Sequence, residues 1–195
     1  ETSSYRSNPL GLAEFTLSRK DPAYVGLAKD IQTAQTAVMK GKCPLEAKPE
    51  LKPVMETIHT RFPEAGEGNI GFGSTIFAVK PGDGSAREQA ASCQKVLGGW
   101  ANIATEYATK RYRSNLINWG MLPFLIEEGP LPFTNKDYLF IPGIRKAVEE
   151  AQDTITAYTV TPEGLTPFPL TLGDLTKEER QIILDGCLIN YNRVK

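Results

Sequence analysis

The feature that most constrains the fold is an alternation of strand-like and helix-like segments in the middle of the chain. Five such segments follow one another at residues 75–79 (strand), 86–97 (helix), 100–104 (strand), 109–118 (helix) and 121–126 (strand). A glycine-rich loop, Pro81-Gly82-Asp83-Gly84, separates the first two. A β-loop-α-β-α-β order is typical of α/β units in which right-handed crossovers join parallel strands. We therefore predict an α/β fold with a mainly parallel sheet flanked by helices.

The segments on either side extend this unit and predict one domain over residues 1–195. Helical spacing of apolar residues predicts helices at 22–38 and 51–62, and a Thr176-x-x-Glu179 capping box predicts a closing helix near the end of the chain. Further segments are predicted at 138–141, 154–160 and 165–172 (strands) and at 144–151 (helix). We divide the domain into a helical N-terminal part (1–65), the β-loop-α-β-α-β core (66–128), and C-terminal strands with the closing helix (129–195).

Composition excludes several classes of protein. The 195 residues hold 22 Lys and Arg against 23 Asp and Glu, and 41% are hydrophobic. These values are globular and exclude collagen, a disordered tail or a coiled coil. A net charge of −1 argues against nucleic acid as a partner, and no apolar run reaches the roughly 20 residues of a membrane span. The first twenty residues lack the apolar stretch of a signal peptide, so we expect a cytoplasmic protein with no membrane partner.

Cysteine and histidine are too sparse for a metal centre. The chain has three widely spaced cysteines, Cys43, Cys93 and Cys187, and one histidine, His59. A metal or iron–sulfur site would need a cluster of such ligands at short spacing. We therefore predict no metal site and no cofactor built from this chain, and interpret each cysteine as a small buried apolar side chain.

The residues that could carry chemistry lie in the stretch from Gly82 to Gln89, where a strand ends and a helix begins. Ligands of open α/β sheets bind at the carboxyl ends of strands, and free N–H groups at a helix start favour an anion or an alkoxide. Arg87 could hold a carboxylate with two parallel hydrogen bonds, and Ser85 lies where the helix field favours deprotonation. Ser85-x-x-Glu88 is also a plain capping box, which leaves a purely structural interpretation open. The stretch is neither a Walker loop nor a dinucleotide fingerprint.

Two segments in the right order and spacing resemble the swivel domain of the aconitase superfamily. The first is GDGSAREQAASCQKVLGGWANIA at residues 82–104, which is similar to the family's Gly-x-Gly-Ser-Ser-Arg-Glu-His or Gln signature. The second is YRSNLINWGMLP at residues 112–123. The resemblance covers roughly residues 73–126, with a weaker similarity to the family's closing helix at LTKEERQIILDGCLINY. It implies an aconitase swivel-like domain of three layers.

The resemblance implies a hydro-lyase that dehydrates and rehydrates a hydroxy di- or tricarboxylate. It implies Ser85 as the base that removes a proton α to a carboxylate, and Arg87 as the group that holds a substrate carboxylate. Gly84 and Ala86 of the same loop, and Arg6, are carried over as further substrate-binding positions. The [4Fe-4S] cluster of such enzymes is expected on a separate domain or large subunit, which would be the partner of this chain. On its own, the chain is expected to be inactive.

Departures from the pattern leave alternatives open. Ala86 replaces the usual second serine, Gln89 stands where histidine is often found, and the Asp-rich opening strand of stand-alone small subunits is not evident. Together with a start at Glu1 rather than Met, this favours the C-terminal domain of a longer hydratase. The alternatives are the small subunit of an isopropylmalate-isomerase-like enzyme and a non-catalytic anion-binding or interaction module. Arg6 also fits solvated surface charge. The basic run of Lys110, Arg111 and Arg113 fits solvated charge or, alternatively, contact with an acidic partner surface.

Overall fold

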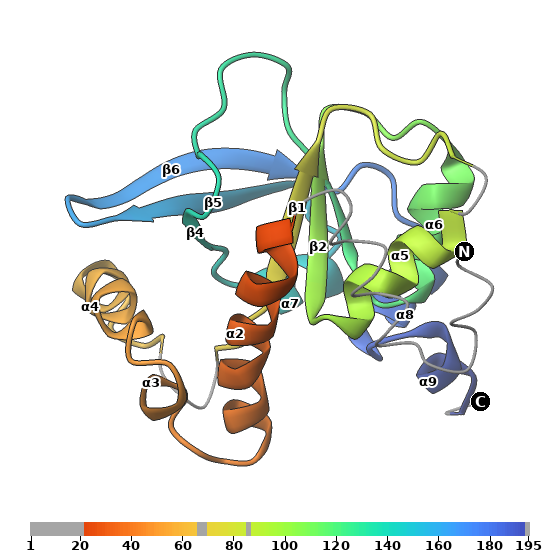
Figure 1. The fold of residues 1–195 in the computed structure, drawn as a ribbon. Helices are drawn as coiled ribbons and strands as arrows, with labels where there is room; N and C mark the ends of the chain where they lie inside the picture. Colours follow the sequence, from red (N-terminus) through yellow and green to blue (C-terminus); the bar gives the residue numbers. More distant parts are fainter. Residues whose placement is uncertain (1–21, 66–69, 85–86, 194–195) are drawn as a thin grey trace.

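The computed structural model describes residues 22–65, 70–84 and 87–193. Six strands within these residues form one sheet in the order β1-β2-β3-β6-β5-β4 (Figure 1). Their bounds are β1 Ser74–Ala78, β2 Gly99–Ala104, β3 Leu122–Leu125, β4 Tyr138–Phe140, β5 Thr154–Thr161 and β6 Gly164–Thr171. Each lies where the sequence predicts a strand.

The direction of the strands divides the sheet into two halves. The pairs β1–β2 and β2–β3 are parallel, as the alternation of strands and helices predicts. The pairs β3–β6, β6–β5 and β5–β4 are antiparallel. The prediction of a mainly parallel sheet is therefore wrong for the C-terminal half. The physical reason is the two-residue connection between β5 and β6, because a hairpin this short can only return the chain antiparallel.

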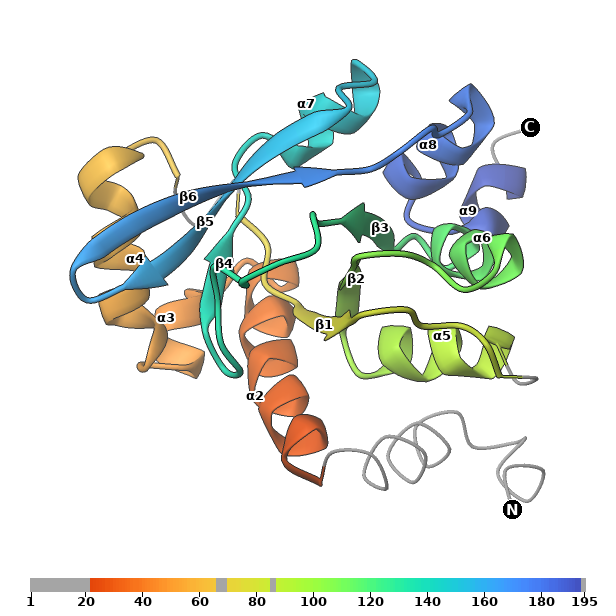
Figure 2. The same cartoon turned by 90° about the horizontal axis from the view of Figure 1, so that it is seen from above.

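Helices lie on two sides of this sheet, which confirms the predicted α/β class. Helices α5, α6, α8 and α9 gather on one side, and α3 and α4 gather on the other, in both views (Figures 1 and 2). The helix bounds are α2 Pro22–Met39, α3 Pro44–Ala47, α4 Leu51–Arg61, α5 Arg87–Val96, α6 Lys110–Asn118, α7 Ile144–Glu149, α8 Lys177–Leu184 and α9 Leu188–Arg193. The short helices α3 and α9 are absent from the sequence prediction. No helix in the described ranges is long and apolar enough to cross a membrane.

Helix ends follow the signals in the sequence. Thr176 caps α8 in the predicted capping box, where its hydroxyl accepts from the Glu179 N–H and the Glu179 carboxylate accepts from the Thr176 N–H. Thr109 caps α6 by accepting from the Tyr112 N–H at 3.1 Å. Gly120 follows α6 with φ +76°, and a Cβ there would lie 1.8 Å from the Gly186 carbonyl oxygen. Glycine is thus required both for the turn and for the close approach of the α8–α9 corner.

The main hydrophobic core joins the two halves of the sheet. Ile103 on β2 and Phe124 on β3 are buried with Ile155 and Leu170 on the antiparallel hairpin, and α7 adds Val148. A second cluster forms between α4 and the far part of the hairpin. The antiparallel half is thereby fixed against the parallel half, whose strands carry the candidate site. The division into parts at 1–65, 66–128 and 129–195 stays a prediction.

Candidate active site

The loop that follows β1 is tied along its length to the loop that follows β2. The Val79 carbonyl accepts from the Glu106 N–H at 3.1 Å and from the Thr105 hydroxyl at 2.7 Å. The Pro81 carbonyl accepts from the Ala108 N–H at 2.9 Å. Both loops leave the carboxyl ends of neighbouring parallel strands, the position where α/β sheets bind ligands. The glycine-rich loop is therefore held by backbone hydrogen bonds up to its first glycine.

Gly82 is the point at which this loop is pressed against α6. Its φ is +99°, and a Cβ there would lie 2.4 Å from Cβ of Tyr112. A backbone in the left-handed region and a contact this close both exclude any residue with a side chain. The carbonyl of Gly82 is fixed as well, because the Thr109 hydroxyl donates to it at 3.2 Å. Gly82 is therefore fixed in conformation and in place.

Arg87 begins α5 and turns back to the same carbonyl. Its Nε donates to the Gly82 oxygen at 3.0 Å, and the side chain is half-buried. This bond uses Nε, the inner nitrogen of the guanidinium. The two terminal nitrogens carry the other four of its five N–H donors, and a pair of these can bind a carboxylate with two parallel hydrogen bonds. Because the guanidinium is planar, a hydrogen bond at Nε also restricts the direction in which its two terminal nitrogens point. Asp83 and Gly84 are exposed beside it, and a Cβ on Gly84 would meet open space.

A buried ring of hydrogen bonds joins the elements that hold the glycine-rich loop. The Tyr112 hydroxyl donates to Oδ1 of Asn102 at 2.7 Å, Nδ2 of Asn102 donates to Oε1 of Gln94, and Nε2 of Gln94 donates back to the Tyr112 oxygen at 3.0 Å. The three side chains come from α6, β2 and α5. Tyr112, Asn102 and Gln94 are 3%, 1% and 6% exposed. The ring therefore fixes α5, which begins at Arg87, relative to β2 and to the helix against which Gly82 packs.

Burial shapes the ionisation of the tyrosines in this layer. Desolvation raises the pKa of Tyr112 above its ordinary value, and a hydrogen bond from Gln94 lowers it in part. Desolvation also raises the pKa of Tyr107 strongly, and the neighbouring Tyr112 adds to the rise. The Tyr107 hydroxyl donates to the Phe124 carbonyl at 2.9 Å. Both phenols thus stay protonated and serve as hydrogen-bonding groups, not as bases at neutral pH.

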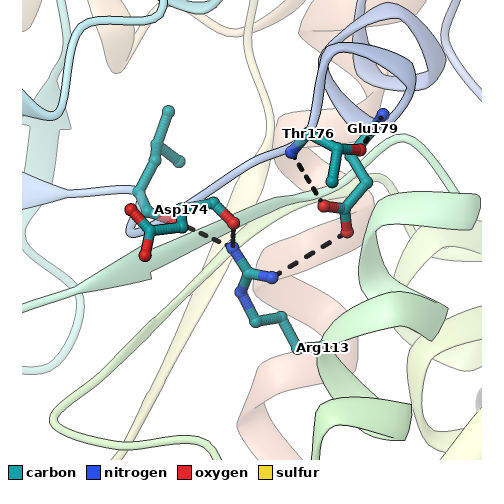
Figure 3. Close-up of polar contacts among 5 residues, drawn as sticks. Arg113, Asp174, Thr176 and Glu179 are labelled. Carbon is teal, nitrogen blue, oxygen red and sulfur yellow. Dashed lines mark hydrogen bonds and ion pairs between the residues drawn. The ribbon is translucent and has the colours of Figure 1, made fainter.

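The second family-like segment contributes a structural arginine. Arg113, one residue after Tyr112, donates through Nη2 to the Leu172 carbonyl at 3.2 Å and to the Asp174 carbonyl at 3.1 Å. Its Nη1 lies 3.8 Å from a carboxylate oxygen of Glu179 on α8 (Figure 3). The interpretation of the basic run as solvated charge is wrong for Arg113. This side chain connects α6 to the segment between β6 and α8.

The predicted site residues divide into those that the structure describes and those that lie outside it. Arg87 and Gly84 are described and lie together at the start of α5. Ser85, Ala86 and Arg6 lie outside the described residues. Two cavities lie away from the described part of the loop. One, of about 410 Å³, is lined by residues of α4, β1 and β4, and the other, of about 490 Å³, is lined by residues of β1 and of the segment 131–139. The described part of the loop is thus an exposed rim of the domain, and the roles of all five residues stay predictions.

The residues present do not fit an iron–sulfur cluster. Cys93 is buried on α5, whereas Cys43 and Cys187 are half-exposed and lie before α3 and before α9, so the prediction of burial is wrong for these two. Within the described ranges, no group of three or more His, Cys, Asp or Glu side chains could hold a metal ion. His59 is hydrogen-bonded to the Ala65 carbonyl.

Sequence reasoning missed Thr109, Gln94 and Asn102 as supports of the site. Thr109 had a detectable signal, because a threonine just before a helical stretch is a standard N-cap. Gln94 lies beside Cys93 among the buried residues of α5. Asn102 lies in a strand candidate with buried neighbours. A polar residue inside a buried segment is the signal that could have found both, because such a group needs a partner.

Comparison with known proteins relates this geometry to a family. The family model described as the aconitase C-terminal domain matches residues 74–129. Thirteen chains of solved structures match. One is the crystal structure of a 3-isopropylmalate dehydratase from Methanocaldococcus jannaschii, with 24% identity, coverage of 76% of this chain and 83% of that chain, and a TM-score of 0.39. The comparison with curated proteins found no match. The predicted resemblance is confirmed, and residues 74–129, which hold β1, the glycine-rich loop, α5, β2, α6 and β3, carry the signature of the aconitase C-terminal domain.

Proposed function

We propose that this chain is the swivel domain of an aconitase-like hydro-lyase that acts on a hydroxy di- or tricarboxylate. The observation that carries the proposal is the match of residues 74–129 to the aconitase C-terminal domain. The geometry of the loop agrees with it, because Gly82 and Arg87 are fixed at the carboxyl end of a parallel strand and Asp83 and Gly84 are exposed there.

In this proposal Ser85 is the base. Dehydration of a hydroxy acid removes a proton from the carbon α to a carboxylate, and an alkoxide strong enough to take that proton must itself be stabilised as an anion. The unpaired N–H groups of a helix start and the helix dipole provide that stabilisation. Ser85 lies two residues before Arg87 in the sequence, and α5 begins at Arg87. The proton passes from the substrate carbon to the serine oxygen, the electron pair of the broken C–H bond forms the C=C bond, and the hydroxyl leaves the neighbouring carbon as hydroxide, for which the partner's cluster would supply a Lewis acid. Hydration reverses these changes.

Arg87 is the carboxylate-binding residue of the proposal. Its Nε is held by the Gly82 carbonyl at 3.0 Å, so the guanidinium plane is oriented before substrate arrives. A planar fork of donors matches the two oxygens of a carboxylate, and preorganisation reduces the entropy that binding costs. Arg87 thereby sets the carbon that carries the acidic proton against Ser85.

The [4Fe-4S] cluster of the proposed enzyme belongs to a different domain or large subunit, because the described residues of this chain do not fit one. The two roles proposed for this chain, proton transfer by Ser85 and carboxylate binding by Arg87, use groups of this chain alone. This chain could be one domain of a long polypeptide or a separate small subunit. In either architecture it would supply a serine base and a fixed arginine.

The proposal is tested by Ser85→Ala and Arg87→Lys in the enzyme reconstituted with the cluster-bearing domain or subunit. Ser85→Ala should lower turnover by several orders of magnitude while the affinity for tricarballylate, a saturated tricarboxylate, stays within about threefold. Arg87→Lys should weaken tricarballylate binding at least about tenfold, because a single ammonium cannot reproduce the fork.

The control is Thr176→Val, which removes a helix cap on α8 and should change neither quantity. Unchanged turnover in Ser85→Ala would refute the catalytic role. Weaker tricarballylate binding in Arg87→Lys, combined with unchanged turnover in Ser85→Ala, would instead identify a non-catalytic anion-binding module.

A further inference from the structure

The Gly82 carbonyl is shared by two side chains from different helices. Arg87 donates to it from the start of α5 at 3.0 Å, and Thr109 donates to it from the start of α6 at 3.2 Å. The Thr109 hydroxyl also accepts from the Tyr112 N–H at 3.1 Å. A continuous chain of hydrogen bonds therefore runs from the α6 backbone through Thr109 and the Gly82 carbonyl to the guanidinium.

We infer that Thr109 is a positioning residue for Arg87, because its hydroxyl holds the carbonyl that orients the guanidinium toward a carboxylate ligand. The inference rests on the proposed function in naming that ligand. The coupling between Thr109 and Arg87 rests on the hydrogen bonds alone.

In the described part of the chain, two side chains determine the direction of this carbonyl. Gly82 has φ +99°, which glycine adopts readily because it has no Cβ to restrict its backbone. Contact with Tyr112 restricts where the residue lies, since a Cβ would approach within 2.4 Å, but the direction of its carbonyl depends on the groups that donate to it. Arg87 is one side-chain donor and is itself the group to be oriented. Among the described residues, Thr109 is the other side-chain donor, and it is anchored to the first turn of α6.

Capping and positioning by Thr109 are separable. Capping uses the hydroxyl oxygen as an acceptor from the Tyr112 N–H, and positioning uses its hydrogen as a donor to Gly82. Thr109→Ser keeps both functions. Thr109→Val loses both, and Thr109→Gly loses the donor while leaving a residue that is tolerated as an N-cap. Thr176→Val is the matched control, because it removes the same kind of cap from α8.

The test measures hydrogen exchange at Nε–H of Arg87 by NMR on the 195-residue chain, with the resonance assigned by its disappearance in Arg87→Lys. We expect Thr109→Val and Thr109→Gly to exchange about two- to tenfold faster than the wild type, the factor that corresponds to one neutral hydrogen bond. Thr109→Ser and Thr176→Val should stay within about twofold. Unchanged exchange in both Thr109→Val and Thr109→Gly would overturn the inference and leave Thr109 as a helix cap.

A second measurement separates this inference from the proposed function. Tricarballylate is titrated into the wild type, Arg87→Lys and Thr109→Val, and its dissociation constant should rise in both variants. An unchanged constant in Arg87→Lys would refute the proposed carboxylate site, while the exchange measurement still decides the coupling between Thr109 and Arg87. If the dissociation constant of tricarballylate rises in Arg87→Lys but does not rise in Thr109→Val, the orientation set by Thr109 has no part in binding.

Discussion

Replacing Tyr112 by phenylalanine tests the buried ring of hydrogen bonds. The substitution keeps the aromatic ring, which packs against Gly82, and removes the hydroxyl alone. That hydroxyl donates to Oδ1 of Asn102 at 2.7 Å and accepts from Nε2 of Gln94 at 3.0 Å. Because both partners are less than 7% exposed, water does not replace the lost group without opening the layer.

The magnitude follows from the two polar atoms left behind. A buried donor or acceptor without a partner costs about 1–3 kcal/mol, so Tyr112→Phe should lower the free energy of unfolding by about 2–6 kcal/mol. The lower end applies if Gln94 closes onto Asn102 to form a direct amide pair. For a chain of this size, about 2–4 °C of melting temperature corresponds to each kcal/mol, which gives a decrease of about 4–24 °C.

The assay is urea unfolding. An unchanged m-value shows that the variant exposes the same surface on unfolding, so that the shift of the midpoint reports the loss of stability. The triple variant Tyr112→Phe, Asn102→Leu, Gln94→Leu should be more stable than Tyr112→Phe alone, since no member of the ring then remains unpaired. Tyr24→Phe is the control, because its hydroxyl has a half-buried partner, Ser74, and should cost less than about 1 kcal/mol. A loss below about 0.5 kcal/mol in Tyr112→Phe, or a triple variant less stable than the single one, would refute the reasoning.

Two further predictions follow from the same layer. Arg113→Lys should lower the free energy of unfolding by about 1–2 kcal/mol in urea titrations, because one ammonium cannot serve both the Leu172 and Asp174 carbonyls and Glu179; a neutral result would make these contacts dispensable. The free energy of unfolding should also fall as pH rises above about 10, because the folded chain keeps the protons of Tyr107 and Tyr112, whose pKa values burial raises, while the unfolded chain releases them. Tyrosinate absorbance appearing for Tyr107 before unfolding would contradict this.

The local signals in the sequence predicted most of the elements, because they depend on neighbours a few residues apart. The Thr176–Glu179 capping box is of this kind. The antiparallel half of the sheet was not predicted, because strand direction depends on how β6 pairs with β3, about 45 residues away along the chain. Only the two-residue turn between β5 and β6 gave a local sign of it.

The candidate site shows the same limit more sharply. Its position at the end of a strand could be predicted from the glycines and the helix start, and so could the presence of Arg87. Its supports could not, because Gln94, Asn102 and Tyr112 meet only when α5, β2 and α6 are packed together. Arg113 likewise reads as surface charge until α8 is placed beside α6.

The supports of the site and the family-like segment coincide. Within the described residues, each hydrogen bond named here that fixes Gly82 or Arg87, or the ring below them, is made by residues between 74 and 129. This is the segment that matches the aconitase C-terminal domain. A constraint on the site therefore acts on its framework as a whole, because a fixed arginine requires Gly82, the α6 cap and the ring at the same time.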